Sequence, residues 1–353
     1  MISSEKLMVY GTTGHHSFHA RVVNILNRTA SLTLRFSHIW HSTWSDGEPG
    51  FCLDEPQKIS DKHVLLFACP ITTRIRSEMA DLIKACKLQY GAKTLTLILG
   101  FLPFRRQDHE EKNNEITRLR WFIRDLKCWG VDHLVVCEPH SEEKTQEFCD
   151  EFGLKLWIAD PTKVFVEAIS GVVAALGKDR VRFYSPDLGS IIRSLRMAKA
   201  MGLQMCASPK LRQNNEVHLV EDSRFLDKVA EIFGDDAALV SCDLNDLAEC
   251  HAFMREDELS TGRTSCSTAH RLKLNRIASV RLIATHPVCS PGWKMALFPF
   301  GELQPFDTIW FGDTRPRGHD ETEYEGSTGG RIIPVSMAPV IVQSLVSVLG
   351  TLS

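Results

Sequence analysis

Length and composition predict a soluble globular protein with two domains. The chain has 353 residues, of which 43% are apolar and 24% are charged, and a chain of this length commonly divides into domains of about 150–200 residues. The net charge of −3 gives no general attraction to nucleic acid or to a membrane, so we expect neither as a partner. Any anion binding must come from local clusters of basic residues.

The cysteines and the N-terminus indicate a cytoplasmic protein. The eleven cysteines lie in apolar stretches such as LFACP and VVCEP, without CxxC spacing, so we expect reduced buried thiols in preference to disulfides or zinc ligands. The stretch MISSEKLMVYGTTG lacks the basic and apolar regions of a signal peptide. The longest apolar run, from Ile332, contains two prolines and is expected to be a packed terminal helix, not a membrane span.

Short β-rich runs alternate with helical patterns along the chain. Helical spacing occurs over 77–91 and 115–130, and in the second the apolar positions 116, 119, 123 and 126 share one face. The segment 222–255 is expected to form a helix, a short strand and a second helix. The runs that indicate buried strands are 63–68, 94–99, 133–138, 180–185, 280–285 and 307–312.

This alternation favours α/β domains with parallel sheets, joined near 155–162. In such folds, ligands bind at the loops beyond the carboxyl ends of the strands. The loop after 94–99, GFLPFRRQDHEEKNN, contains Arg105 and Arg106 followed by Gln107 and Asp108. Paired guanidinium groups bind phosphate oxygens well, but the same run is equally typical of a solvated charged loop. The chain has no GxxxxGK[ST] phosphate loop.

Three further loops carry candidate residues. His140, after 133–138, could bind magnesium or a triphosphate, although a lone histidine is more often structural. Asp187, in SPDLGS, suits either a helix cap or a carboxylate that binds a metal or a sugar hydroxyl. Lys210 and Arg212, in SPKLRQNNE, are either ordinary surface residues or cations that neutralise a transferring phosphoryl group.

The stretch EDELSTGRT is typical of a sugar-phosphate loop. Glu256 and Asp257 precede a Ser-Thr-Gly turn that leads into a helical pattern. Hydroxyls and a glycine at a helix N-terminus can hold a phosphate, and the carboxylates can bind sugar hydroxyls. Arg263, in the tightest part of this turn, is unexpected.

Taken together, these motifs resemble the ribose-phosphate pyrophosphokinase (phosphoribosyl diphosphate synthetase) family over nearly the whole chain. MVYGTTGHHSFHARVVNIL is similar to its opening strand, turn and helix, and WSDGEPGF to its DGE segment. IKACKLQYGAKTLTLILGFLPFRRQD resembles its helix, strand and RQD nucleotide loop, and VDHLVVCEPHS the strand that ends in a catalytic histidine. SPDLGS, KLRQNNEV and EDELSTGRTSCSTAHRL resemble the SPD-x-G loop, the flexible catalytic loop and the sugar-phosphate loop, in the same order.

The resemblance implies an α/β fold with two phosphoribosyltransferase-type (type I) domains, each a parallel sheet flanked by helices. Residues 1–158 would form the domain with the ATP-binding RQD loop, and 159–331 the domain with the catalytic and sugar-phosphate loops. A C-terminal helix at about 332–353 would pack back on the first domain. The resemblance also implies a homo-oligomer, either a dimer or a hexamer.

The implied reaction moves the β,γ-diphosphoryl group of ATP, with Mg²⁺ as cofactor, to the anomeric C1 hydroxyl of ribose 5-phosphate and releases AMP. Because the nucleophile belongs to the substrate, the protein mainly positions groups and neutralises charge. The resemblance assigns catalysis to His140, Lys210 and Arg212, and metal binding to His140 and Asp187. It assigns ATP binding to Asp46, Glu48, Arg105, Arg106, Gln107 and Asp108, and acceptor binding to Glu256, Asp257, Ser260, Thr261, Gly262, Arg263 and Thr264.

The chain departs from the family in the acceptor loop. Glu256 stands where the family usually has Asp, Ser260 where it has a later Asp, and Arg263 where it has a small residue. Outside this loop, 222–255 is longer than expected, and Arg74 and Arg76 stand where Asn and Asp are usual. Arg263 adds a planar cation, which suits an acceptor whose 5-phosphate continues into more phosphate, such as ADP-ribose in NAD-related metabolism.

Two other hypotheses remain open. A catalytically silent homologue could regulate an active synthetase, but it would not need His140, Lys210 and Arg212 as charge stabilisers. A phosphoribosyltransferase would share the domain type, but the RQD loop and the two-domain length argue against it. The leading hypothesis is an active pyrophosphokinase that acts on ribose 5-phosphate or on a larger molecule that contains it.

Overall fold

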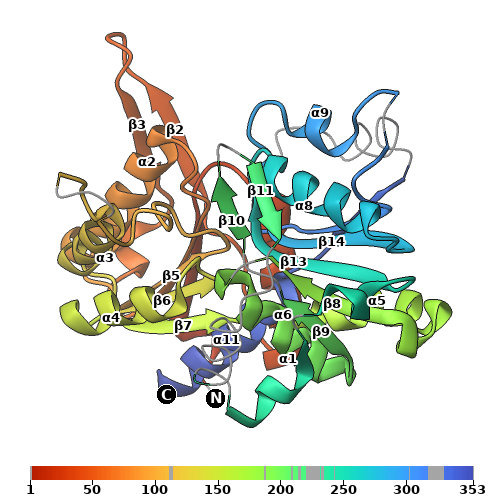
Figure 1. The fold of residues 1–353 in the computed structure, drawn as a ribbon. Coiled ribbons are helices and arrows are strands. Elements are labelled where there is room, and N and C mark those ends of the chain that lie inside the picture. Colours follow the sequence, from red (N-terminus) through yellow and green to blue (C-terminus); the bar gives the residue numbers. More distant parts are fainter. Residues whose placement is uncertain are drawn as a thin grey trace. The chain divides into compact units, whose positions relative to one another are not determined.

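The computed structural model describes residues 2–110, 114–186, 188–207, 210–213, 216–219, 231, 234–241, 243–301, 303–316 and 330–352. The chain forms two compact units, Met1–Asp160 together with Met337–Ser353, and Pro161–Ser336. Each unit contains a parallel sheet with helices on both faces (Figure 1). The predicted α/β class is therefore confirmed.

The sheet of the first unit has the strand order β1-β4-β5-β6-β7 among the described residues, and all neighbouring pairs are parallel. Its central strands are continuous apolar runs because helices cover both faces. The strands are β1 (Leu7–Gly11), β4 (His63–Ala68), β5 (Thr94–Leu99), β6 (His133–Cys137) and β7 (Lys155–Ala159).

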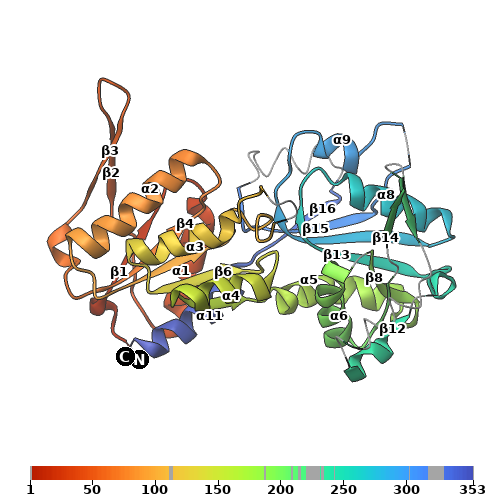
Figure 2. The same ribbon diagram turned by 60° about the vertical axis from the view of Figure 1, so that its left-hand side comes forward.

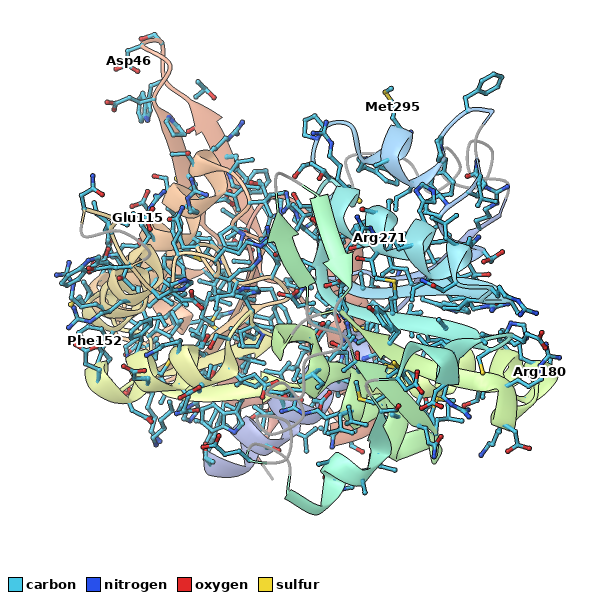
Figure 3. The ribbon with its side chains drawn as sticks, viewed as in Figure 1. Asp46, Glu115, Phe152, Arg180, Arg271 and Met295 are labelled. Carbon is cyan, nitrogen blue, oxygen red and sulfur yellow. The ribbon has the colours of Figure 1, made fainter. Side chains whose placement is uncertain are left out.

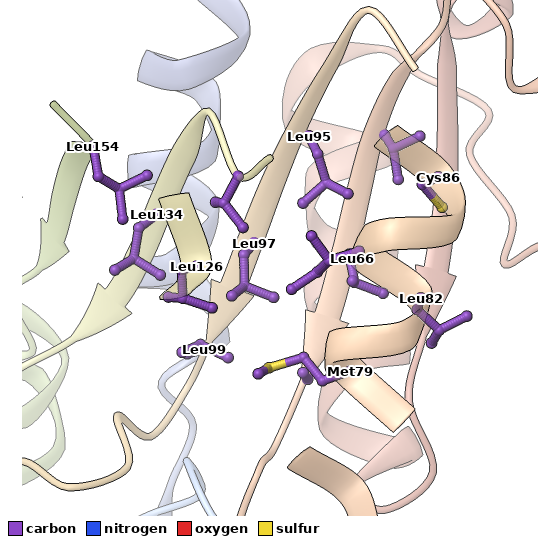
Figure 4. Close-up of a cluster of buried hydrophobic side chains, with 14 of the residues drawn as sticks. Leu66, Met79, Leu82, Cys86, Leu95, Leu97, Leu99, Leu126, Leu134 and Leu154 are labelled. Carbon is purple, nitrogen blue, oxygen red and sulfur yellow. The ribbon is translucent and has the colours of Figure 1, made fainter. Parts of the chain in front are cut away.

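Helices cover the two faces of this sheet in two groups, α2, α3 and α4 on one face and α1 and α11 on the other (Figure 2). Alternate residues of each strand point to opposite faces. Leu66, Leu97 and Leu134 therefore pack with Leu82 and Leu126 in the core under the first group (Figure 4). The helices are α1 (His16–Ala30), α2 (Thr73–Lys84), α3 (Arg118–Trp129), α4 (Glu142–Phe152) and α11 (Ala338–Thr351).

Two helix predictions in this unit need correction. The prediction that Ile116 shares the buried face of the 115–130 helix is wrong, because α3 begins only at Arg118 and the Ile116 side chain is 66% exposed. The other three apolar positions of that face are buried, and the helix ends at the left-handed Gly130. The predicted 77–91 helix starts earlier, at Thr73, where the Thr72 hydroxyl caps it, and its last part, Ala85–Gln89, is a π-helical turn.

A two-stranded antiparallel hairpin, β2 (Ile39–Thr43) and β3 (Pro49–Leu53), projects from the first unit (Figure 1). Trp40 and Trp44 are 63% and 66% exposed on it. Large exposed aromatic side chains grouped on one element are typical of a surface that contacts another molecule.

The second unit contains a sheet with the strand order β12-β9-β8-β13-β14-β15-β16 among the described residues, again with only parallel pairs. Beside it lies a separate antiparallel pair, β10 (Lys210–Gln213) and β11 (Glu216–Leu219). The strands of the sheet are β8 (Val181–Ser185), β9 (Gln204–Ala207), β12 (Val240–Ser241), β13 (His251–Leu259), β14 (Ser279–Pro287), β15 (Thr308–Gly312) and β16 (Ile332–Val335).

Helices α5 and α6 lie on one face of this sheet and α8 on the other, in both views (Figures 1 and 2). Short helix α9 lies against the first turns of α8, where its Leu297 side chain is buried. The helices are α5 (Thr162–Leu176), α6 (Leu188–Met201), α8 (Arg263–Leu274) and α9 (Trp293–Leu297).

Two sequence-based expectations for the second unit are also corrected. The predicted second helix of 222–255 is only a short 3-10 turn, Leu244–Leu247, and His251 already begins β13, the buried central strand. The start of the expected 332–353 helix, Ile332–Val335, is instead strand β16, which pairs with β15. Since a proline at the first helical positions is compatible with a helix start, α11 begins at Ala338 next to Pro339.

The structure bears on two expectations from the sequence, the absence of a membrane-spanning helix and the presence of reduced, buried cysteines. In the part of the chain that the structure describes, no helix is both long and apolar enough to cross a membrane. The ten described cysteines are free thiols, and seven of them are buried.

His19 on α1 is a buried histidine in the first unit, packed against the ring of Phe67. Burial, with smaller contributions from the neighbouring charges of His15 and His16, lowers the pKa of His19 from 6.5 to about 3. The folded state therefore keeps this imidazole neutral at pH values where the unfolded chain would protonate it. The contribution of His19 to the unfolding free energy is fully present above pH 6.5 and is lost as the pH falls toward 3.

We predict that the His19→Leu variant will lose less stability in acid than the wild-type protein. Between pH 6.5 and 4 the wild-type unfolding free energy should fall relative to the variant by about 1.4 kcal/mol per pH unit, the maximum slope for one proton. Urea unfolding of both proteins at a series of pH values measures this difference. Parallel pH profiles would contradict the buried neutral state of His19.

Candidate active site

The predicted acceptor loop lies at the carboxyl end of the central strand β13. Ser260, Thr261 and Gly262 follow this strand directly, and α8 begins at Arg263. The first helical bond joins Cys266 N to Gly262 O at 2.8 Å. The preceding amides at the start of α8 thus have the orientation in which helix N-termini bind phosphate groups.

Gly262 is required at this turn for two reasons. Its φ of 74° lies in the left-handed region, which disfavours residues with a Cβ. A Cβ at this position would also lie 3.2 Å from Leu297 Cδ2 of α9. The close approach of α9 to the loop therefore depends on glycine here.

The acidic pair is held from two sides of the sheet. Asp257 is buried, and its Oδ2 lies 3.9 Å from Arg193 Nη2 on α6. The half-buried Glu256 accepts a hydrogen bond of 3.2 Å from the Ser265 hydroxyl on α8. The two carboxylates thus belong to opposite faces of β13, as adjacent residues of a strand must.

Arg255, directly before the pair, is a buried cation that the sequence analysis did not single out. Its side chain is 1% exposed and lies over the Phe165 ring of α5, with 4.8 Å from Cζ to the ring centroid. Nη2 donates a hydrogen bond of 2.8 Å to the Thr285 hydroxyl on β14, and Nη1 donates to the Glu256 carbonyl oxygen. Arg255 therefore holds the backbone of the acidic pair in place through the Glu256 carbonyl oxygen.

Neighbouring loops at the same edge of the sheet stiffen the acceptor loop. Ser290, after β14, donates its backbone N–H to the Ser260 carbonyl at 3.2 Å, and the two hydroxyls are 2.8 Å apart. Deeper in the sheet, His286 Nδ1 lies 2.7 Å from the Thr314 hydroxyl. Ser260, which replaces an expected acidic residue, thus serves here as a hydrogen-bonding link between two loops.

In the first unit, the RQD segment follows β5 at the carboxyl edge of that sheet. Gln107 N donates to Phe104 O at 2.8 Å, and Leu119 N donates to Gln107 O at 3.1 Å, so the segment is tied to the start of α3. The Asp108 carboxylate is buried and hydrogen bonds to His109 Nδ1 at 2.6 Å. Arg106 and Gln107 are exposed.

Aromatic rings hold several arginines at this edge. The guanidinium of Arg105 lies 4.2 Å from the centroid of the Phe101 ring. Arg118 and Arg76 lie over the Phe104 ring at 4.0 and 5.3 Å. Arg76, which departs from the family pattern, is thus part of the same cationic group. Ring stacking orients a guanidinium without neutralising it, which suits the binding of polyphosphate.

His140 lies at the neighbouring carboxyl end of β6 and is half-buried. The next residue, Ser141, caps α4 by accepting a hydrogen bond from Lys144 N at 3.1 Å. Hydrogen bonding to Glu147 raises the pKa of the exposed Lys144, and Asp108 contributes a small part of the shift through its charge. Because β5 and β6 are neighbouring parallel strands, the RQD segment and the His140 segment follow the same edge of the sheet.

Other predicted residues are separate from this group or lie outside the described side chains. Asp46 and Glu48 lie in the exposed turn of the β2–β3 hairpin, where Glu48 N donates to Asp46 Oδ1 at 3.1 Å. Figure 3 shows Asp46 at the hairpin tip, well apart from Glu115 near the end of the RQD loop. Lys210 and Arg212 lie on β10, with only their backbone described. Asp187 falls outside the described residues.

A magnesium ion would need oxygen ligands from the protein, from phosphate groups or from water. Among the described residues, no three His, Cys, Asp or Glu side chains form a group that could hold a metal. Mg²⁺ that enters with a nucleotide takes most of its ligands from phosphate oxygens and water, and needs only one or two protein groups. The oxygen-rich edge of β13, with Glu256 and Asp257, fits such a role better than an all-protein cage.

No protein-family model matches the chain. Among curated proteins it is similar to the ribose-phosphate pyrophosphokinase of Vibrio parahaemolyticus, with 25% identity over 70% of this chain and 71% of that protein. The enzyme of the same name from Ralstonia nicotianae is 22% identical over 97% of this chain and 95% of its own length. Phosphoribosylpyrophosphate synthetase from Mycobacterium smegmatis has the same fold, with a TM-score of 0.76, 19% identity and coverage of 98% and 99%.

The chain is a distant relative of the ribose-phosphate pyrophosphokinases. The predicted family, the fold with two phosphoribosyltransferase-type domains and the enzyme class, a transferase of the pyrophosphokinase type, are thereby confirmed.

Sequence analysis of this pyrophosphokinase relative missed the residues that support the loops. Arg255, Arg193 and Ser290 lie in stretches that have no motif of their own. One signal was available for Arg255, because a charged residue directly after the apolar run HAFM is unusual in a buried strand. The partners of these residues are distant in the sequence, so only the fold identifies them.

We predict that Arg255→Ala will lower the unfolding free energy by about 3 kcal/mol, because it removes hydrogen bonds from a buried cation and leaves a cavity beside Phe165. Arg255→Met should lower the unfolding free energy by less than Arg255→Ala does, since methionine retains much of the apolar volume. Urea unfolding measures both variants. An Arg255→Ala variant within about 0.5 kcal/mol of wild type would contradict the supporting role.

Proposed function

We propose that the protein transfers the β,γ-diphosphoryl group of ATP to the C1 hydroxyl of ribose 5-phosphate or of an acceptor that contains it. The C1 oxygen forms a bond to the β-phosphorus and loses its proton, the bond from the β-phosphorus to the oxygen shared with the α-phosphate breaks, and AMP leaves. The products are AMP and the sugar 1-diphosphate.

The observation that carries this proposal is the acceptor loop of the second unit. An acidic pair at the end of β13 leads through a left-handed glycine into the N-terminus of α8. We assign Glu256 and Asp257 to the ribose hydroxyls, and the hydroxyls and amides of residues 260–264 to the 5-phosphate. Arg193 lies beside the buried Asp257 carboxylate, and Arg255 holds the Glu256 backbone, so the pair can bind a sugar in a fixed orientation.

We assign ATP to the first unit, with Arg105, Arg106, Gln107 and Asp108 as the main contacts and the hairpin residues Asp46 and Glu48 as further ones. Ring-stacked arginines near His140 favour a polyphosphate over an uncharged ligand. On this proposal the domain of 1–158 with the C-terminal helix binds the nucleotide, and the domain of 159–331 binds the acceptor.

The charge that develops during transfer needs cations. We assign this task to His140, Lys210 and Arg212, and we assign Mg²⁺ binding to ATP phosphates with His140 and Asp187. When bound, the ion would neutralise phosphate charge. The cytoplasmic location and the homo-oligomer, a dimer or a hexamer, stay predictions.

A second candidate acceptor is ADP-ribose, with the same chemistry at its C1 hydroxyl. The observation that favours it is Arg263, an exposed cation at the first position of α8, directly beside the proposed phosphate site. A second phosphate beyond the 5-phosphate adds negative charge, which the Arg263 guanidinium can neutralise through charge-assisted hydrogen bonds.

We predict AMP release when the protein is supplied with Mg-ATP and ribose 5-phosphate. His140→Ala should reduce kcat by about 100-fold or more, because a group that stabilises charge in the transition state is removed. His16→Ala, an exposed histidine on α1, is the matched control and should retain full activity. Chromatographic measurement of AMP tests both variants.

Absence of AMP with both ribose 5-phosphate and ADP-ribose would contradict the enzyme assignment and favour the regulatory homologue. Equal activity of His140→Ala and the control would remove His140 from the mechanism.

A further inference from the structure

A groove of about 450 Å³ lies between α8 and α9 in the second unit. Its lining includes Arg263, Cys266, His270 and Arg271 from α8, and Met295 and Pro299 from α9 and the segment after it. The α8 residues recur at spacings of three and four, so they form one face of the helix. Figure 3 labels Met295 on α9 and Arg271 on α8.

The groove begins at the proposed phosphate site. Arg263 is both the residue after the acceptor loop and part of the groove lining. Helix α9 is held against this end, because Leu297 packs with Cys266 in one apolar cluster and the Cys266 thiol donates to Ala296 O at 3.3 Å. A ligand bound at the start of α8 would therefore have a continuous path into the groove.

The charge of the lining is positive. Two of its residues are arginines and none is a carboxylate. Burial raises the pKa of the Cys266 thiol to about 12, so Cys266 adds no negative charge. Met295, which is 81% exposed, and Pro299 supply apolar surface, and His270 is fixed by a contact of 3.0 Å between Nε2 and Leu303 O. Cations beside apolar surface suit a phosphate that continues into a flat ring system.

The length of the groove matches such a ligand. Arg263 and Arg271 are eight residues apart on α8, which corresponds to about 12 Å along the helix axis. This distance is enough for a second phosphate followed by a nucleoside. Ribose 5-phosphate alone ends at the start of the helix and would leave the groove unfilled.

We propose that the α8–α9 groove binds the second phosphate and the nucleoside of an acceptor that continues beyond its 5-phosphate. The inference rests on the proposed function for the identity of the first phosphate site. Arg263 contacts the second phosphate, Met295 and Pro299 pack on the base, and Arg271 contacts the far end of the nucleoside. ADP-ribose is the simplest probe, because it combines a free C1 hydroxyl with a diphosphate and a nucleoside.

The test compares ADP-ribose with ribose 5-phosphate as acceptors for wild type, Arg271→Ala and Arg180→Ala. Arg180 is an exposed arginine of the same unit outside the groove. We expect Arg271→Ala to lower the ratio of kcat/KM for ADP-ribose to kcat/KM for ribose 5-phosphate by about 10-fold, as expected for the loss of one charge-assisted contact. Arg180→Ala should keep the wild-type ratio.

Direct calorimetric binding of ADP-ribose separates this inference from the proposed function. If no acceptor releases AMP but ADP-ribose binds wild type about 10-fold more tightly than Arg271→Ala, the proposed function fails and the groove assignment stands. If ribose 5-phosphate releases AMP while ADP-ribose neither reacts nor binds, the groove assignment is overturned and the function stands. An unchanged acceptor ratio in Arg271→Ala would also overturn it.

Discussion

The left-handed turn at Gly262 is the constraint on which the acceptor side of the molecule depends. It carries the chain from the end of β13 into α8 and lets Leu297 of α9 approach closely. The helix amides, the α8–α9 groove and the link from Ser260 to Ser290 all follow from this turn. A side chain at position 262 would strain the backbone and would also force the Leu297 side chain of α9 to shift.

A second feature of the molecule is that its arginines near the loops differ in how deeply they are buried. Arg255 is buried, hydrogen bonded and stacked on Phe165, so it supports the backbone and does not meet a ligand. Arg105 and Arg118 are stacked on rings at the edge of the first sheet and are less buried. Arg263 is exposed at the start of a helix. Arginine is thus buried where it supports the fold and less buried at the positions for which ligand binding is proposed.

Much of the fold could be predicted from the sequence, because the apolar runs of β4 and β5 are continuous and bounded by clear turns. Local patterns failed where tertiary pairing decides the outcome. Ile332–Val335 belongs to an apolar stretch that looks helical, but its place beside β15 makes it a strand. His251 was expected within a helix for the same reason, although it begins the central strand of its sheet. The loops proposed to bind phosphate were found through their order along the chain, whereas the residues that support these loops required the structure.

The central claim is that a diphosphoryl group, not a single phosphoryl group, moves to the acceptor. Its most direct measurement uses separate samples of ATP labelled with ³²P in the α-, β- or γ-phosphate, with ribose 5-phosphate or ADP-ribose as acceptor. We expect the β- and γ-labels to appear together in the sugar product and the α-label to appear in AMP. Transfer of the γ-label alone, with the other two labels retained in ADP, would contradict it.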